Sequence, residues 1–303
     1  MSFKKLTSET LSKIRPELEQ KLPISAMMLN IINVVLINSK NPEDDCCTIF
    51  GYNGASDITN LFIVAVFLLL NQDKFSVIYT HDTIVTDEML TAFSELHDWS
   101  KPYMFGAVPE SFLGHLEKIV DQNGGKLLKR PSAAVYLPLE DSVGLNLCKV
   151  DLEDDFEVDR LTIENATKVN THWRYGSIVD HKRIAEAIKT LKSAGVFKRT
   201  KHPKTGEISS SRTNEDLVSW IVFRQIGTLN ALYTVDDYRR RGLARWALEA
   251  ASKWLAEAGF IPVCDIEEYN EDSRKLVDKI GFKLIQTVFW MTYEPSNGHA
   301  LQE

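Results

Sequence analysis

A strand, a tight turn rich in arginine and a long amphipathic helix follow one another between residues 228 and 257. This order constrains the fold more than any other feature of the sequence. The strand is the apolar segment TLNALYTV, the turn is DDYRRRG, and the helix is predicted to begin near Gly242. The apolar face of that helix is formed by residues at helical spacing, namely Leu243, Ala247, Ala250 and Trp254. A strand leading directly into such a helix is typical of a mixed α/β domain.

The opposite face of this helix carries charge at every fourth position, which predicts a row of solvent-exposed side chains. The residues in this row are Arg245, Glu249, Lys253 and Glu257. Because the apolar and charged rows are cleanly separated, we expect the helix to lie on the surface of a sheet.

Short apolar segments rich in β-branched or aromatic residues predict strands elsewhere in the chain. They include CTIFGY, LFIVAVFLLL, FSVIYT and SAAVYLPL in the first half, and DLVSWIVFR, FIPVCDI and a strand pair within FKLIQTVFWMTY in the second. Helices are predicted near residues 27–36, 87–97 and 109–122, and over NATKVNTHW, HKRIAEAIKTLKSAG and EDSRKLVDKIG. The acidic segment DLEDD, residues 151–155, is the best boundary between the two series. We therefore predict two domains, residues 1–150 and 151–303.

Composition excludes several classes of protein. The net charge of −7 argues against a protein that coats nucleic acid, because phosphate affinity depends on many Lys and Arg contacts. The longest apolar run, residues 61–70, is half of the roughly 20 residues that a membrane helix needs. The four cysteines form no CxxC pair and have no histidine at metal spacing, so we expect reduced thiols and no metal. The start of the chain lacks a secretory pattern, which favours the cytoplasm, with a mitochondrial location as the alternative.

The arginine-rich turn has the chemistry of an anion site. The first amides of a helix have no intrahelical partners, and the helix dipole is positive at the same end. Gly242 has no Cβ and Ala244 is small, so a phosphate could approach the backbone closely. Arg239, Arg240 and Arg241 add forked donors that suit phosphate. The alternative is that these arginines are only solvated side chains, since R-x-x-G-x-A alone also occurs by chance.

Two motifs together resemble a known superfamily. Arg239-x-x-Gly242-x-Ala244 after LYTV is similar to the acyl-CoA-binding motif of the GNAT acyltransferases. Downstream, EEYNEDSRKLVDKIGF is similar to the last signature of the same superfamily. The segments ATKVNTHWRYG, LVSWIVFRQIG, VDDYRRRGLA and LAEAGFIPV resemble, in order and spacing, the glycine N-acyltransferase-like family, whose members resemble two joined GNAT-like units. This resemblance implies a mixed, mostly antiparallel sheet flanked by helices in each half, with a degenerate N-terminal unit.

The resemblance also implies where an acyl-CoA co-substrate, such as acetyl-CoA, would bind. The pyrophosphate would lie on the amides from Arg240 through Leu243 to Ala244. The pantetheine arm would pair with backbone near Tyr233 and Val235. On the neighbouring strand end, the signature residues are Asn270 and Ser273, of which Asn270 would contact the arm. A small amine or amino acid would then attack the thioester directly, without a covalent enzyme intermediate. No oligomeric state is implied.

The sequence departs from this family at both usual proton-transfer positions. The glutamate that serves as the base in glycine N-acyltransferases corresponds to Thr228, and the tyrosine that protonates the thiolate in many GNAT enzymes corresponds to Val277. Glu267, or its neighbour Glu268, is a substitute base, although both also fit solvated loop carboxylates. A second explanation for the two substitutions is that the protein accelerates the transfer by positioning the reactants alone. The third is that the protein is a noncatalytic acyl-CoA sensor or scaffold.

Overall fold

The computed structural model describes residues 1–38, 47–58, 60–68, 74–80, 84–145, 147, 155–179, 181–199 and 213–296. Its first half contains, in order, β1 (Phe3–Lys5), α1 (Ser8–Gln20), α2 (Ala26–Asn38), β2 (Cys47–Tyr52), β3 (Phe62–Leu68), β4 (Lys74–Thr80), α3 (Asp87–Ser94), β5 (Tyr103–Pro109), α4 (Glu110–Asn123) and β6 (Gly125–Tyr136). A short helix, α5 (Leu139–Gly144), follows.

The second half repeats this order of elements. It contains β7 (Phe156–Arg160), the 3₁₀ turn η2 (Ile163–Asn165), α6 (Ala166–His172), α7 (His181–Thr190), β8 (Ala194–Lys198), β9 (Leu217–Phe223), β10 (Leu229–Thr234), η3 (Asp236–Tyr238), α8 (Leu243–Glu257), β11 (Val263–Glu267), α9 (Glu271–Ile280) and β12 (Lys283–Pro295). The predicted strand pair at the end is therefore wrong, because β12 is one continuous strand. Helices α1 and α5 were not predicted.

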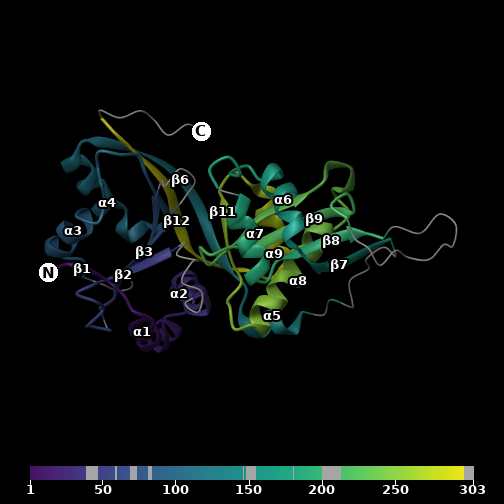
Figure 1. The fold of residues 1–303 in the computed structure, drawn as a ribbon, viewed down its shortest axis with the longest axis horizontal. Helices are drawn as coiled ribbons and strands as arrows, with labels where there is room; N and C mark the ends of the chain where they lie inside the picture. The colour runs from purple at the N-terminus through teal and green to yellow at the C-terminus, as the bar shows by residue number, and fades with distance from the viewer. Residues whose placement is uncertain are drawn as a thin grey trace.

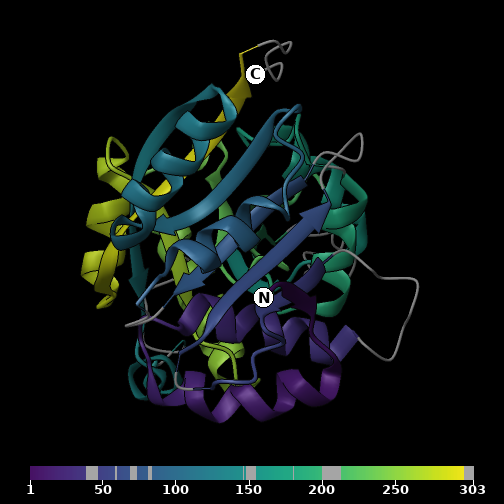
Figure 2. The same ribbon diagram turned by 90° about the vertical axis from the view of Figure 1, so that its left-hand side faces the viewer.

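Strand β3 is buried on both faces, which explains its uninterrupted apolar sequence. Ile63 and Ala65 face the cluster formed with helices α1 and α2, whereas Phe62 and Val64 face the cluster formed with α3 and α4. The two helix pairs thus cover opposite faces of the sheet (Figure 2). This packing confirms the predicted buried strand over residues 62–67, whereas Leu68 is exposed and residues 69 and 70 lie outside the described ranges. No helix in the described part of the chain is long and apolar enough to span a bilayer.

The strands form two sheets, and the larger one contains strands from both halves. Its order is β1-β2-β3-β4-β5-β12-β6-β11, and the smaller sheet has the order β10-β9-β8-β7. All the strand pairs are antiparallel except β4–β5. The mixed, mostly antiparallel α/β architecture predicted from the sequence is confirmed.

The last two strands of the second half join the sheet of the first half. Strand β12, from the end of the chain, lies between β5 and β6, where Tyr293 pairs with both Tyr103 and Leu127. Strand β11 pairs only with β6 of the first half, in a register that places Asp265 opposite Ala134. Figure 1 shows β6 and β12 running together from the first half toward β11. The larger sheet therefore contains the last two strands of the second half, whereas the smaller sheet contains strands of the second half alone.

The proposed boundary at residue 150 lies outside the described residues, so the division into 1–150 and 151–303 stays a prediction. The pairing of second-half strands with β6 bears directly on this division. A cut between the two ranges would separate β11 and β12 from the strand β6 with which both are hydrogen-bonded.

Candidate functional site

The turn between β10 and α8 leaves the beginning of the helix open. Gly242 precedes the first helical residue with φ +79°, and Arg240 is also left-handed with φ +61°. A Cβ built on Gly242 would meet no atom within 4 Å. Within the described residues, no backbone carbonyl accepts a hydrogen bond from the amides of Arg240, Gly242, Leu243 or Ala244. The left-handed backbone favours glycine at 242, and the space beside its Cα is open.

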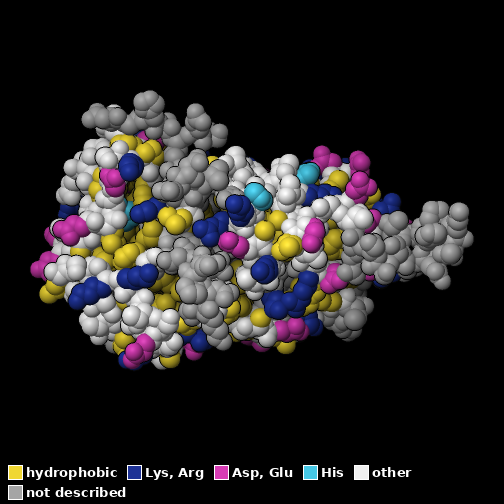
Figure 3. All heavy atoms as spheres, in the orientation of Figure 1, with side chains coloured by type: hydrophobic (Ala, Val, Ile, Leu, Met, Phe, Trp, Pro, Cys, Tyr) yellow, Lys and Arg dark blue, Asp and Glu magenta, His cyan; other side chains and the backbone are white. Residues whose placement is uncertain are grey.

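The three arginines of this turn have different surroundings. Arg239 is held on the turn, with Nη2 2.8 Å from Asp236 Oδ1 and Nε donating to the Thr234 carbonyl. The Arg241 guanidinium lies 4.6 Å from the centre of the Phe156 ring. Arg240 is exposed and, within the described part of the chain, has no ion-pair partner, so its side chain is available to an anion. Lys and Arg side chains gather on the surface over the region of α8 (Figure 3).

One prediction for helix α8 is wrong. Glu249 was expected on the exposed face, but its side chain is only 4% exposed and accepts a hydrogen bond from Arg245 Nε at 2.7 Å. Helix α5 packs against α8, and Lys253 Nζ donates to the carbonyl of Leu145 just beyond α5. The unpredicted helix therefore covers part of a face that the charge pattern assigned to solvent.

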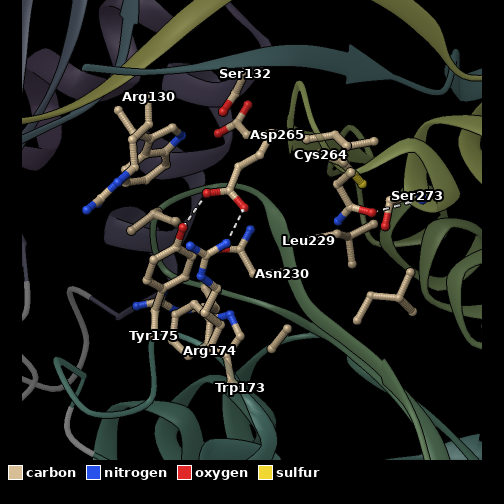
Figure 4. A pocket seen from close by; sticks show the side chains of 18 of the residues that line it. Arg130, Ser132, Trp173, Arg174, Tyr175, Leu229, Asn230, Cys264, Asp265 and Ser273 are labelled. Carbon is tan, nitrogen blue, oxygen red and sulfur yellow. Dashed lines mark hydrogen bonds and ion pairs between the residues drawn. The ribbon is translucent and has the colours of Figure 1, made fainter. Parts of the chain in front are cut away.

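A cavity of about 490 Å³ opens where β10 and β11 diverge. The two strands lie at the edges of different sheets, because β10 pairs with β9 and β11 pairs with β6. A bulge between Asn230 and Tyr233, with Ala231 at φ +55°, bends β10 at this point. The cavity is also lined by β6, β12, the segment after α6 and the start of α9 (Figure 4). Both halves of the chain therefore contribute to it.

The residues predicted to contact the pantetheine arm are only partly available. Tyr233 lines the cavity, but its carbonyl accepts from Ser219 Oγ at 3.0 Å. The N–H of Val235 donates to the carbonyl of Val218, and the carbonyl of Val235 accepts from the amide of Tyr238. The pairing of the arm with Val235 stays a prediction.

Asn270 and Ser273 both line the cavity. Asn270 is also the N-cap of α9, where its Oδ1 accepts from the Ser273 amide at 3.1 Å. The capping bond occupies the side-chain oxygen of Asn270, and its NH₂ group is left as the donor that could contact a ligand.

The positions that depart from the family pattern are apolar or inaccessible. Thr228 is fully buried, and its hydroxyl accepts a hydrogen bond from Asn230 at 2.8 Å. Val277 is buried and contributes an apolar surface to the cavity. Neither residue can transfer a proton at this site.

Of the two candidate glutamates, only Glu267 lines the cavity, whereas Glu268 is exposed outside it. Both carboxylate oxygens of Glu267 are engaged. The hydroxyls of Tyr175 and Tyr269 donate to them, and Arg174 Nη1 lies 3.4 Å from Oε2. Burial, followed by the hydrogen bond to Glu267, raises the pKa of Tyr175 to about 12. Glu267 therefore belongs to a satisfied polar cluster.

Two charged residues in the cavity were missed by the sequence analysis. Arg224 is 8% exposed, stacks over the Trp173 ring at 4.6 Å, and has a buried Nε without a hydrogen-bond partner. Burial lowers its pKa to about 10. Asp265, in the middle of β11, has two buried oxygens that accept no hydrogen bond. The signal in the sequence is a charged residue beside a run of buried apolar ones, in IVFRQ and PVCDI.

The cysteines fit their predicted role where they are described. Cys47 and Cys264 are buried and not disulfide-bonded, and burial raises the pKa of the Cys264 thiol. Cys46 and Cys148 lie outside the described residues. In the described ranges, no group of three or more His, Cys, Asp or Glu side chains is arranged to bind a metal ion.

Comparisons with known proteins identify the fold. Residues 207–291 match the family model described as FR47-like protein. A Drosophila protein of known structure is 18% identical, with a TM-score of 0.80 over 97% of this chain and 99% of that one. No curated protein matches the sequence.

Two further structures are named as acetyltransferases. A candidate acetyltransferase from Pyrococcus horikoshii is 10% identical, with a TM-score of 0.54 over 96% of this chain and 88% of that one. The GCN5-related glucosamine N-acetyltransferase region of a fungal β-N-acetylglucosaminidase is 9% identical, with a TM-score of 0.50 over 96% of this chain and 38% of that one. These likenesses confirm the predicted mixed, mostly antiparallel fold, whereas its division into two tandem units stays a prediction. The narrower resemblance to glycine N-acyltransferases stays a prediction.

Proposed function

We propose that this protein is an N-acyltransferase that transfers an acyl group from an acyl-CoA to a small amine or amino acid. The observation that carries the proposal is the cavity between the diverging edges of β10 and β11, beside a helix whose first amides are open. An open helix N-terminus suits a pyrophosphate, and a gap between strands suits an extended thiol arm. The match of residues 207–291 to the FR47-like model and the GNAT-like fold support this arrangement.

In this proposal the coenzyme is anchored at the turn before α8. The amides of residues 240–244 would bind the pyrophosphate, with the exposed Arg240 side chain beside them. The arm would pass Tyr233 and the free NH₂ group of Asn270, and the thioester would reach the cavity. An acceptor amine would attack the thioester carbon directly, so that the C–S bond breaks and the coenzyme leaves as a thiolate.

The acceptor that best fits the cavity carries a carboxylate besides its amine. Among the described residues, Arg224 has no acidic partner, and its guanidinium is held by stacking on Trp173. A buried cation without a counter-ion is costly, and a ligand carboxylate would compensate it with charge-assisted hydrogen bonds. An amino acid is the simplest molecule that offers both groups.

The proposal is tested by incubating the purified full chain with acetyl-CoA, benzoyl-CoA and longer acyl-CoAs, each with a panel of amines and amino acids. We expect acceptor-dependent release of free coenzyme A thiol, followed with a thiol reagent, and the acylated amine in the product mixture. Tight coenzyme binding with no acceptor-dependent thiol release would instead favour a noncatalytic acyl-CoA sensor. That function is the main alternative because Thr228 and Val277 replace the usual base and acid.

Arg224→Gln is expected to raise the KM for carboxylate-bearing acceptors by about 10- to 100-fold, because a hydrogen bond to a charged group contributes about 1.5–3 kcal/mol. The KM for simple amines without a carboxylate should change little. Arg174→Gln is the matched control, since Arg174 also lines the cavity but is 62% exposed and contacts Glu267. Equal losses for both acceptor classes would contradict a role for Arg224 in carboxylate recognition.

A further inference from the structure

Asp265 has no partner for its charge. It lies in β11 opposite Ala134 of β6, and Figure 4 shows its carboxylate beside the side chain of Ser132 at the edge of the cavity. Both oxygens of Asp265 are buried without accepting a hydrogen bond, and the Ser132 hydroxyl is likewise buried without a partner. The Trp290 indole is near enough to favour the charged form slightly, but it does not complete a hydrogen bond.

The charged and titratable groups around Asp265 come from several elements. Those that line the same cavity are Arg130 from β6, His172 at the end of α6, Arg174 and Tyr175 from the segment after it, Arg224 after β9, Tyr233 from β10, Cys264 and Glu267 from β11, and Tyr269 just beyond β11. A smaller cavity of about 280 Å³ on the other side of Asp265 is lined by Tyr79 and His115. Within the described residues, none of these groups forms an ion pair with Asp265.

An unpaired buried carboxylate opposes folding, so packing does not explain its presence in β11. The positions on either side, Cys264 and Ile266, are apolar and buried in the core of the second half. Burial also raises the pKa of Asp265 to about 7, which leaves the group able to gain or lose a proton near neutral pH. A carboxylate with these properties beside a cavity is typical of a proton-transfer group.

The other carboxylate of the cavity is less suited to this chemistry. Glu267 is already bound by Tyr175, Tyr269 and Arg174, and these donors occupy its oxygens. Asp265 is therefore the carboxylate, among the described lining residues, whose oxygens accept no hydrogen bond.

We propose that Asp265 is the general base that takes a proton from the ammonium group of the acceptor before the nitrogen attacks the thioester. This role rests on the proposed N-acyltransferase function. The proton passes from the ammonium nitrogen to a carboxylate oxygen of Asp265, and the free amine forms a C–N bond with the acyl carbon. As the C–S bond breaks, the second proton of the nitrogen goes to the coenzyme thiolate. Asp265 then releases its proton to solvent.

The test compares wild-type protein with Asp265→Asn, which keeps the side-chain shape and removes the base. We expect kcat/KM for the acceptor to fall by at least about 100-fold, with coenzyme affinity unchanged, because general base catalysis contributes about 100- to 10,000-fold. The wild-type kcat/KM should rise with pH through about 7, as Asp265 becomes ionised, and this rise should be absent in the variant. Glu267→Gln is the matched control and should retain the rise.

Thermal unfolding provides a readout besides activity. The folded-state pKa of Asp265 is raised above its unfolded value, so its carboxylate costs nothing at low pH and destabilises the fold as pH rises from about 4 through about 7. Asp265→Asn should therefore melt at a higher temperature than wild type at pH 8, and the difference should shrink as the pH is lowered toward 4. Asp265→Ser is the second neutral variant if the asparagine variant does not fold.

The outcomes separate the two proposals. Wild-type thiol release that survives in a folded neutral variant, or a pH-dependent rise that disappears in Glu267→Gln instead, would overturn the role of Asp265 alone. Wild-type protein that binds acyl-CoA but never releases thiol would overturn the transferase function and the base together. A more stable but inactive Asp265→Asn variant would support both.

Discussion

Replacing Gly242 by valine is expected to lower the affinity for coenzyme A by about 100-fold, corresponding to two lost hydrogen bonds to a charged group at about 1.5 kcal/mol each. The new side chain would project into the open space before α8, where the structure places no atom within 4 Å of a Cβ. It would also oppose the left-handed backbone, with φ +79°, that turns the first amides outward. Calorimetric titration with coenzyme A measures the loss.

Gly259→Val separates the blocked approach of the coenzyme from the strain of the left-handed backbone. Gly259 lies just after the other end of α8, has φ +80°, and also has no atom within 4 Å of a Cβ. Valine there introduces comparable backbone strain without approaching the proposed pyrophosphate site. We expect it to lower the melting temperature as much as Gly242→Val while leaving coenzyme affinity unchanged. Equal affinities in all three proteins would show that the coenzyme binds elsewhere.

The fragment 151–303, expressed alone, is expected to lack a cooperative unfolding transition and to aggregate. Strand β12 would lose both of its neighbours, β5 and β6, and β11 would lose its pairing with residues 132–136. Unpaired strand edges promote association with other chains, and the buried side chains of β12, such as Tyr293, would become exposed. Circular dichroism during heating and size-exclusion chromatography measure the outcome.

Co-expression of fragment 151–303 with fragment 1–150 is the control. Strands β11 and β12 should pair again with β5 and β6, so that the larger sheet reassembles. The two fragments should then form a soluble complex with a cooperative unfolding transition. A fragment 151–303 that folds alone and binds coenzyme A would contradict this prediction and would show that the second half does not need β6.

Local features of the sequence were sufficient for the elements with the clearest patterns. The apolar run from residue 61 predicted a buried strand, and the structure shows that both of its faces are covered by helices. The helix near Gly242 begins at Leu243, because a glycine that tolerates positive φ is followed by an amphipathic pattern. These predictions succeeded because burial on both faces and helical periodicity leave a signal within a few consecutive residues.

Features that depend on distant contacts were not predictable in this way. Glu249 looked solvent-exposed from its spacing, but its side chain is buried and paired with Arg245. Arg224 and Asp265 were each visible as a charge near apolar residues, yet their sequence neighbours did not reveal that they line one cavity. Whether such a charge is paired depends on side chains from strands that are far away in the sequence.

The amino-acid sequence alone was enough to predict the mixed α/β class, the two series of elements and the glycine turn before α8, because each depends on interactions among neighbouring residues. The fold was needed to show that β12 lies between β5 and β6, that β11 pairs with the first half, and that the gap beside β10 contains an unpaired carboxylate. Strand pairing uses backbone groups, which every residue carries, so the choice of partner depends on how the whole chain packs.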